Sequence, residues 1–313
     1  MSQSYLAPSA CDTGGGHSPL FVMLFLSVLL CLVAGCRDGA VPPANPTEQT
    51  NRNAAPSPTQ TEVAAADAID KGDLKFRYQP RKGFRAGAAP RKVGSNPEAV
   101  EKIIATLNDR IALPFDIVVS SQDCDDPDAF YEAETHQLTV CHQLVDEYYD
   151  LFSRKVKDKA KLDDVVRGAV ASTFFHELGH ALVDAWQIPI TGKEEDAVDQ
   201  LSTLVLIDRT EEGEQMALDG ALSFKLYADL GKSEEKIYWD EHSLDEQRFY
   251  DTICLIYGHD PEKYAYLVKD GTLPEERAGL CREDFPKIEK SWKRLLSPYI
   301  KKTPGADSNL KLK

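Results

Sequence analysis

The sequence predicts an α+β fold in which a small N-terminal sheet precedes a mostly helical body. Segments of β-branched and aromatic residues, such as FDIVVS at 115–120, are concentrated before residue 142. Beyond that point, apolar residues recur at three- and four-residue spacing, which is typical of amphipathic helices. With 313 residues and 42% hydrophobic composition, the chain is long and apolar enough to bury a sizeable core.

The strands are expected early in the folded part, with one helix between the first two. Pro97–Arg110 carries helical periodicity, and Ala133–His136 reads as a turn between two short strands. The predicted strands are Asp73–Gln79, Phe115–Ser120, Ala129–Glu132 and Gln137–Cys141. Gln137–Val140 is a candidate edge strand beside a cleft, where an extended peptide could pair with it.

Seven helices are expected in the body. Pro189 and Gly231 supply stop signals for the second and the fourth of them. The predicted helices are Leu144–Arg154, Asp163–Gln187, Glu194–Arg209, Glu214–Leu230, Leu244–Tyr257, Pro261–Val268 and Pro274–Leu296.

The N-terminus predicts export and a lipid anchor. An apolar run from Leu20 to Gly35 ends at Cys36, and its last residues resemble a bacterial lipobox, in which the cysteine is diacylated. We therefore expect a signal peptide at 1–36, a disordered Pro/Ala/Thr-rich tether at 37–71, a folded domain at 72–300 and a disordered tail at 301–313. An uncleaved membrane anchor is the alternative, and the absence of Lys or Arg before the run leaves the start codon open. The expected location is the bacterial cell envelope.

Charge and cysteine content narrow the partners and the compartment. A net charge of −15 argues against nucleic acid, because phosphate binding needs a basic surface. Four cysteines lie in the body, and in an oxidising compartment we expect the disulfides Cys124–Cys141 and Cys254–Cys281. Four reduced, buried thiols are the alternative if the protein is cytosolic.

The chemical signal is His176-Glu177-Leu178-Gly179-His180. Histidines at i and i+4 of a helix project from one face and can share one zinc ion. Glu177, one position along, can then reach a zinc-bound water and act as general base. The alternative is a buried helix whose polar residues satisfy one another.

A catalytic zinc also needs a third protein ligand. Glu195 and Asp199 are i and i+4 on the next predicted helix, so Glu195 can bind the metal while Asp199 accepts a ring N–H from a ligand histidine. Glu194 is the competing ligand, or a helix-start carboxylate.

These residues resemble the Glu-type zincins, metallopeptidases that hold zinc with two histidines and a glutamate. More closely, the chain is similar to the DUF4344 type of bacterial metallopeptidases over about residues 115–285. The matching stretches are DAFYEAETHQLTVCHQLVDE, FFHELGHALVD, GKEEDAVDQLST, WDEHSLDEQRFYDTICLIYGHDP and LPEERAGLC. The resemblance implies a zincin-like fold with His176, His180 and Glu195 as ligands and Glu177 as base, but it implies no particular substrate.

Peptide hydrolysis passes through an oxyanion, and a hydrogen-bond donor from the protein can stabilise it. The candidate donors are His242, Arg248 and Tyr250. For each of them, the alternative is a purely structural hydrogen bond. His136 and His142 are expected at the surface or in turns. The expected partners are a peptide or protein substrate and, through the lipid, the membrane. Two functions remain open at this point: a zinc-dependent metallopeptidase, or a non-catalytic, zincin-shaped envelope lipoprotein that binds a partner.

Overall fold

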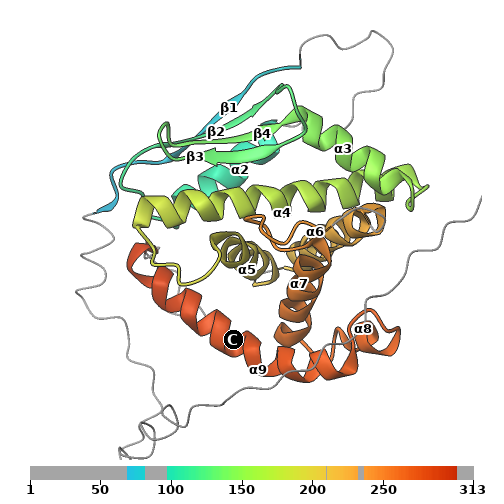
Figure 1. Cartoon of the computed structure of the whole chain (residues 1–313). Coiled ribbons are helices and arrows are strands. Elements are labelled where there is room, and N and C mark those ends of the chain that lie inside the picture. Colours follow the sequence, from blue (N-terminus) through green and yellow to red (C-terminus); the bar gives the residue numbers. More distant parts are fainter. Residues whose placement is uncertain (1–68, 82–96, 209, 232–235, 302–313) are drawn as a thin grey trace, which may run out of the picture. The chain divides into compact units, whose positions relative to one another are not determined.

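The computed structural model describes residues 69–81, 97–208, 210–231 and 236–301. These residues form an α+β fold with a small sheet and a mostly helical body, as the sequence predicts (Figure 1). The proposed signal peptide with Cys36, nearly all of the proposed tether and nearly all of the proposed tail lie outside the described residues. At the start of the described part, Asp70 and Lys71 already contact the domain, since Asp70 pairs with Lys301 and the Lys71 N–H donates to the Leu113 carbonyl.

The sheet has four strands in the order β1-β2-β4-β3. The strands are β1 (Leu74–Tyr78), β2 (Ile117–Gln122), β3 (Ala129–Glu132) and β4 (Gln137–Cys141). The pairs β1–β2 and β2–β4 are parallel, whereas β3 and β4 form an antiparallel hairpin. The predicted turn closes this hairpin, and His136 takes a left-handed φ of 51° there.

The edge strand beside the cleft is β3, so the assignment of that role to Gln137–Val140 was wrong. Those residues belong to β4, which is paired on both sides, with β2 and with β3. Leu138 and Thr139 of this strand are fully buried. The sequence does not indicate which strand of this hairpin lies at the edge of the sheet. Tertiary pairing with the other strands decides it.

The helices follow the predicted order with shifted boundaries. They are α2 (Pro97–Asn108), α3 (His142–Ser153), α4 (Lys159–Trp186), α5 (Glu194–Ile207), α6 (Glu211–Leu230), α7 (Asp245–His259), α8 (Ala265–Lys269) and α9 (Glu275–Leu296), followed by the 3-10 turn η2 (Ser297–Tyr299). The largest differences at a helix start are four residues: α8 begins four residues after the predicted Pro261, and α4 begins four residues before the predicted Asp163. The Asp158 side chain caps it there by accepting from the Lys161 N–H at 2.9 Å.

Helix α4 lies between the sheet and helices α5, α6, α7 and α9 (Figure 1). One core cluster joins it to the sheet and to α9, through residues such as Val119, Leu182 and Trp292. On its other side, α4 packs against α5 and α6. Because α4 is buried along much of its length, polar side chains in its middle lie inside the molecule rather than in solvent.

Glycines allow the close approach of the helices beside α4. A Cβ at Gly179 would lie 2.8 Å from the Val198 Cβ of α5, and a Cβ at Gly168 would lie 2.1 Å from an Asp219 oxygen of α6. The Ser202 hydroxyl of α5 also donates to the Ser172 carbonyl of α4 at 2.8 Å. Helices α4 and α5 are therefore held in close contact where both carry polar residues.

Both cysteine pairs expected from the sequence are disulfides in the structure, Cys124–Cys141 and Cys254–Cys281. The first joins the loop after β2 to the end of β4, and the second joins α7 to α9. Within the described ranges, no helix is both long enough and apolar enough to cross a membrane.

Candidate metal centre

Helix α4 presents the two histidines of the HELGH segment on one face. The ring centroids of His176 and His180 lie 5.0 Å apart, as expected for residues one helical turn apart. His176 is buried and His180 is half-buried. The helix therefore places two imidazoles side by side in a setting that is largely shielded from solvent.

Helix α5 brings the Glu195 carboxylate between the two rings. The His176 Nε2 lies 3.1 Å from one oxygen of Glu195, and the His180 Nε2 lies 3.4 Å from the other. Glu195 is in the first turn of α5, which returns along α4 after the loop between Trp186 and Glu194. The carboxylate predicted as third ligand thus faces both histidines.

The three donor groups fit a small divalent cation. In a tetrahedral site with bonds of about 2.0–2.1 Å, neighbouring donor atoms lie about 3.3 Å apart. The two nitrogen–oxygen distances, 3.1 and 3.4 Å, bracket that separation, although they lead to different oxygens of Glu195. Two imidazoles and one carboxylate are donor types that suit a divalent metal ion and leave a coordination position for another group.

Each histidine ring is also held at its other nitrogen. The His176 Nδ1 lies 2.8 Å from the Asp199 carboxylate, and the His180 Nδ1 lies 2.8 Å from that of Glu194. Hydrogen bonds of this kind fix the tautomer and the orientation of a metal-binding histidine. Asp199 therefore has the partner that the sequence predicts. Glu194 lies in the first turn of α5, as its interpretation as a helix-start carboxylate expects, and its carboxylate is also a partner of the His180 ring.

Arg248 of α7 completes the Asp199 interaction. Its Nε and one terminal nitrogen donate to the two Asp199 oxygens at 2.7 and 2.8 Å. The guanidinium also lies 4.2 Å from the centroid of the Phe224 ring. With both donors directed at Asp199, Arg248 is a partner of that carboxylate, and its sequence-based candidacy as oxyanion donor has no geometric support.

The electrostatics of the cluster favour a bound cation. Burial alone would lower the pKa of His176, but hydrogen bonds to Asp199 and Glu195 raise it to about 9. Burial alone would raise the pKa of Glu195, but hydrogen bonds from His176, His180 and His242 hold it far below its usual range. A proton on His176 occupies the place that a metal ion would take, and the anionic Glu195 attracts either one.

Glu177 lies beside the cluster without joining it. It is only 7% exposed, and its nearest charged partner is the His176 Nε2 at 4.0 Å. Burial raises the pKa of its carboxyl group, with the nearby histidines acting in the opposite direction. This carboxylate lines the same cleft as the two histidines.

His242 comes from the loop before α7 and meets the same carboxylate. Its Nε2 lies 3.0 Å from a Glu195 oxygen. The loop is fixed to α5 because the Lys193 ammonium donates to the His242 carbonyl and the Ser243 hydroxyl donates to Asp196. Among the described residues, the group whose donor atoms all lie within 4.8 Å of one another is His176, Glu195 and His242. The predicted ligand His180 contacts Glu195 at 3.4 Å but does not join this group.

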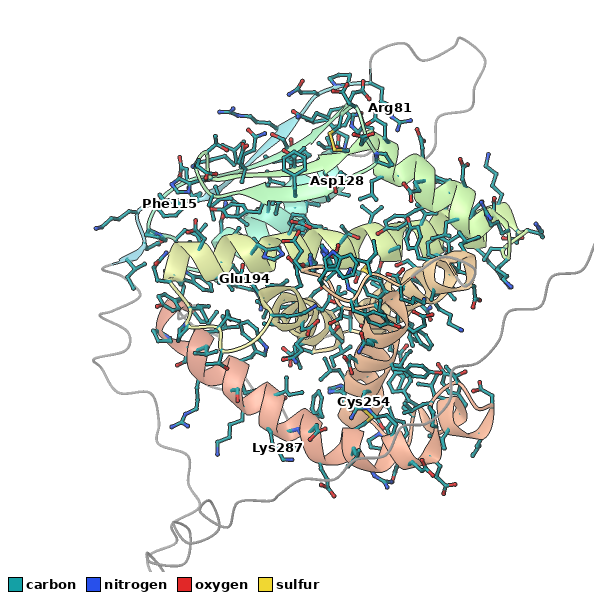
Figure 2. All side chains as sticks on the ribbon, viewed as in Figure 1. Arg81, Phe115, Asp128, Glu194, Cys254 and Lys287 are labelled. Carbon is teal, nitrogen blue, oxygen red and sulfur yellow. A yellow bond between two sulfur atoms is a disulfide. The ribbon has the colours of Figure 1, made fainter. Side chains whose placement is uncertain are left out.

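These groups open into one cleft of about 770 Å³ between the β3 hairpin, α4 and the start of α5. In Figure 2, Asp128 lies on the sheet side of α4, and Glu194 is labelled at α5. The lining residues are Asp128, Ala129, Phe130, Tyr131, Ala133, His176, Glu177, His180, Val183, Asp184, Gln187, Ile188, Glu194, Glu195, Glu241 and His242. A volume of this size suits a peptide segment or a small ligand.

Three other predictions concern residues away from the metal group. Tyr250 is 37% exposed on α7, outside the cleft lining. His136 lies in the hairpin turn, as expected, and stacks on Phe115. The surface or turn position expected for His142 was wrong: it is 3% exposed at the start of α3 and contacts Asp123 and Ser121. Burial lowers its pKa, against the effect of its carboxylate partner.

A family model described as "Putative metallopeptidase", DUF4344, matches residues 87–296, two thirds of the chain and all of the site. The chain belongs to the DUF4344 family. No curated protein and no solved structure matches it significantly. Membership of the DUF4344 metallopeptidases implies a metal ion and a peptide or protein substrate, and the histidine and glutamate group is the place where the described residues can hold that ion.

Proposed function

We propose that this protein is a zinc-dependent metallopeptidase that hydrolyses peptide bonds with Glu177 as general base. The observation that carries the proposal is the contact of both His176 and His180 with the Glu195 carboxylate, beside the separate, buried carboxylate of Glu177. A purely structural metal site needs the three ligands but has no use for Glu177. Hydrolysis needs both.

Zinc is the metal that this set of donors favours. Two imidazoles and one carboxylate, with a coordination position left open, form a common ligand set for catalytic zinc. Hard cations such as Mg²⁺ and Ca²⁺ prefer sites built from oxygen atoms alone.

When bound, zinc lowers the pKa of a coordinated water and polarises the carbonyl group of the substrate. Glu177 would take the proton from the attacking water and return it to the leaving amine, a role that suits a buried carboxyl with a raised pKa. In this proposal His242 would donate to the oxygen that gains negative charge, and the support is that its ring lines the cleft and its loop is bonded to Lys193 at the start of α5.

The proposal includes a zincin-like arrangement of the site. Its support is the antiparallel edge strand β3, which lines the cleft on one side while the HELGH segment of α4 lines it on the other. An extended peptide could add to the free edge of β3 through main-chain hydrogen bonds, which would hold the scissile bond over the metal group.

Glu177→Gln separates catalysis from metal binding. We expect the purified wild type to contain about one equivalent of zinc and to cleave peptides. The variant should keep the zinc and lose activity by a factor of about 10² to 10⁴. Less than about a tenth of an equivalent of zinc in the wild type would contradict the proposal. A variant that retains zinc and changes no activity or phenotype would instead favour the non-catalytic, partner-binding lipoprotein.

The same proposal places the protein in the bacterial cell envelope, anchored through lipid on Cys36. The two disulfides support an oxidising compartment. Metabolic labelling with palmitate should mark the wild type and leave Cys36→Ser unlabelled. Label on both proteins, or on neither, would contradict the anchor.

A further inference from the structure

We propose that the cleft selects cationic peptides, and that Asp128 and Glu241 recognise a Lys or Arg side chain next to the scissile bond. This inference rests on the proposed peptidase function and adds the substrate class. The starting observation is the negative charge of the cleft lining. The proposed metal ligands and the proposed general base account for only part of that charge.

The lining of the cleft is strongly one-sided in charge. Among the described residues, six acidic ones line it, and no Lys or Arg does. A divalent cation would neutralise two of these six charges and leave a net negative wall. A low-dielectric cleft lined by charges of one sign raises the local concentration of substrates of the opposite sign. The net charge of −15 for the whole chain acts in the same direction.

Most of the six carboxylates already have a role. Glu195 faces the two histidines and Glu177 is the proposed base. Glu194 accepts from the His180 ring, and Asp184 accepts from the Tyr131 hydroxyl at 2.8 Å. The two that remain are Asp128 and Glu241. Among the described residues, Asp128 accepts only from the neighbouring Ala129 N–H, and Glu241 has no side-chain partner.

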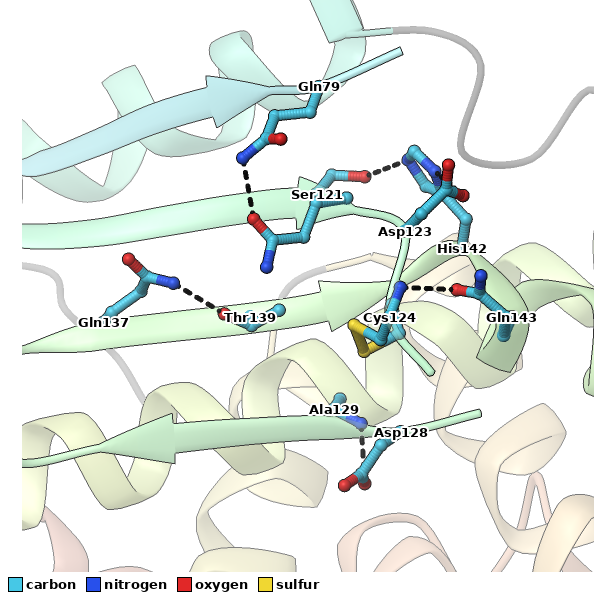
Figure 3. Close-up of a disulfide and its surroundings, with 12 residues drawn as sticks. Gln79, Ser121, Asp123, Cys124, Asp128, Ala129, Gln137, Thr139, His142 and Gln143 are labelled. Carbon is cyan, nitrogen blue, oxygen red and sulfur yellow. Dashed lines mark hydrogen bonds and ion pairs between the residues drawn. A yellow bond between two sulfur atoms is a disulfide. The ribbon is translucent and has the colours of Figure 1, made fainter. Parts of the chain in front are cut away.

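Asp128 is held in place on the sheet side of the cleft. Its carbonyl accepts from the Cys141 N–H at 3.0 Å, and the Cys124–Cys141 disulfide closes the loop that leads to it (Figure 3). The loop reads DCDDPD at 123–128, so the fixed carboxylate lies within an acidic segment. Asp128 lines the same cleft as His176 and Glu177.

Glu177 also has capacity to accept a hydrogen bond from a bound molecule. It is 7% exposed, its nearest charged partner is the His176 ring at 4.0 Å, and no other described residue donates a hydrogen bond to its carboxylate. A buried carboxylate normally has donors around it. Because Glu177 lines the same cleft as Asp128 and Glu241, a peptide bound there can supply such a donor.

The physical reason for selecting Lys or Arg is the pairing of charges. An ammonium or guanidinium group that binds a carboxylate makes a charge-assisted hydrogen bond, which is stronger than a neutral one. A Glu or Asp at the same substrate position would instead meet only negative charge. The cleft should therefore discriminate most between cationic and anionic peptides, with neutral peptides between them.

The test measures binding apart from turnover. The full-length, zinc-loaded Glu177→Gln protein is titrated with fluorescent peptides that differ only in a central Lys, norleucine or Glu, and anisotropy is recorded. We expect the Lys peptide to bind about tenfold more tightly than the norleucine peptide, and the preference to shrink as salt is added. Adding Asp128→Asn should reduce that preference by about threefold or more, and Glu241→Gln should act in the same direction.

Asp126→Asn is the matched control, because it removes the same charge from the same exposed loop outside the cleft lining. It should leave the preference unchanged. Equal affinity for the Lys and norleucine peptides would overturn the inference. So would an equal effect of Asp128→Asn and Asp126→Asn on the preference for the Lys peptide. Turnover by the wild type distinguishes this inference from the proposed peptidase function. Cleavage of peptides without preference for Lys or Arg would contradict only the inference. Binding of Lys peptides without cleavage of any peptide would contradict the peptidase function.

Discussion

Asp199 connects the candidate metal centre to the half-buried guanidinium of Arg248. It accepts from the His176 ring on one side and from two Arg248 nitrogens on the other. These hydrogen bonds outweigh burial and lower the pKa of Asp199 to about 2. The carboxylate therefore stays charged over the whole range in which a histidine can bind metal, and it keeps the His176 Nε2 directed at Glu195.

Replacing Asp199 with Asn should weaken zinc binding by a factor of about 10 to 100, because the amide is a poorer acceptor and leaves Arg248 without a counter-charge. Competition with a chromophoric zinc chelator measures this affinity. The exposed Glu212→Gln at the start of α6 removes one charge far from the histidines in sequence and serves as control. An Asp199→Asn protein that holds zinc as tightly as the control would show that the ring of His176 needs no charged partner.

At the scale of elements, the contact between α4 and α5 decides whether the three ligands meet. Gly179 lies inside the HELGH segment and faces Val198, which is fully buried on α5. Since Glu195 lies in the first turn of the same α5, any displacement of this helix moves the carboxylate away from the two imidazoles. The glycine thus acts through helix packing.

Gly179→Ala should push α5 away from α4, because the new methyl group would lie 2.8 Å from the Val198 Cβ. We expect a loss of about 1–3 kcal/mol in the free energy of unfolding, together with weaker zinc binding. Urea denaturation and zinc titration measure the two effects. Gly279→Ala on α9 is the control: its Cβ meets nothing within 4 Å. The control should gain about 0.5–1 kcal/mol from helix propensity. Equal behaviour of both variants would contradict the close-packing argument.

At the scale of the whole molecule, buried carboxyl groups should make stability depend on pH. Burial raises the pKa of Asp219, on α6 against Gly168, from 3.8 to about 6, although Gln215 donates a hydrogen bond to it. The folded state therefore prefers the protonated form. The stability that the protein has while Asp219 is protonated is fully present below about pH 4. It is lost as the pH rises through about 6, and it is absent at pH 7.

Asp219→Asn should therefore stabilise the protein at pH 7 relative to the wild type, by about 1–3 kcal/mol more than it does at pH 4. Chemical denaturation of both proteins at the two pH values gives the difference. The same measurement on the exposed Glu212→Gln should show little pH-dependent change. A difference of the opposite sign for Asp219→Asn would mean that the folded protein favours the charged carboxylate.

The sequence by itself determined the α+β class, the order of the elements and the two histidines of α4. Helical periodicity and the i, i+4 spacing of His176 and His180 are local properties, so they can be read without knowledge of distant contacts. The spacing of Glu195 and Asp199 on the next helix was likewise sufficient to predict that both would face the histidines, because a short loop limits how α5 can return along α4.

Only the tertiary structure decided which groups complete the site. It placed Arg248 on Asp199 and Glu194 on His180, and it made β3, not β4, the edge of the sheet beside the cleft. It also buried His142. These outcomes depend on contacts between segments far apart in the chain, where several polar residues compete for the same partner. Local patterns carry no information about which of them will be adjacent once the core has packed.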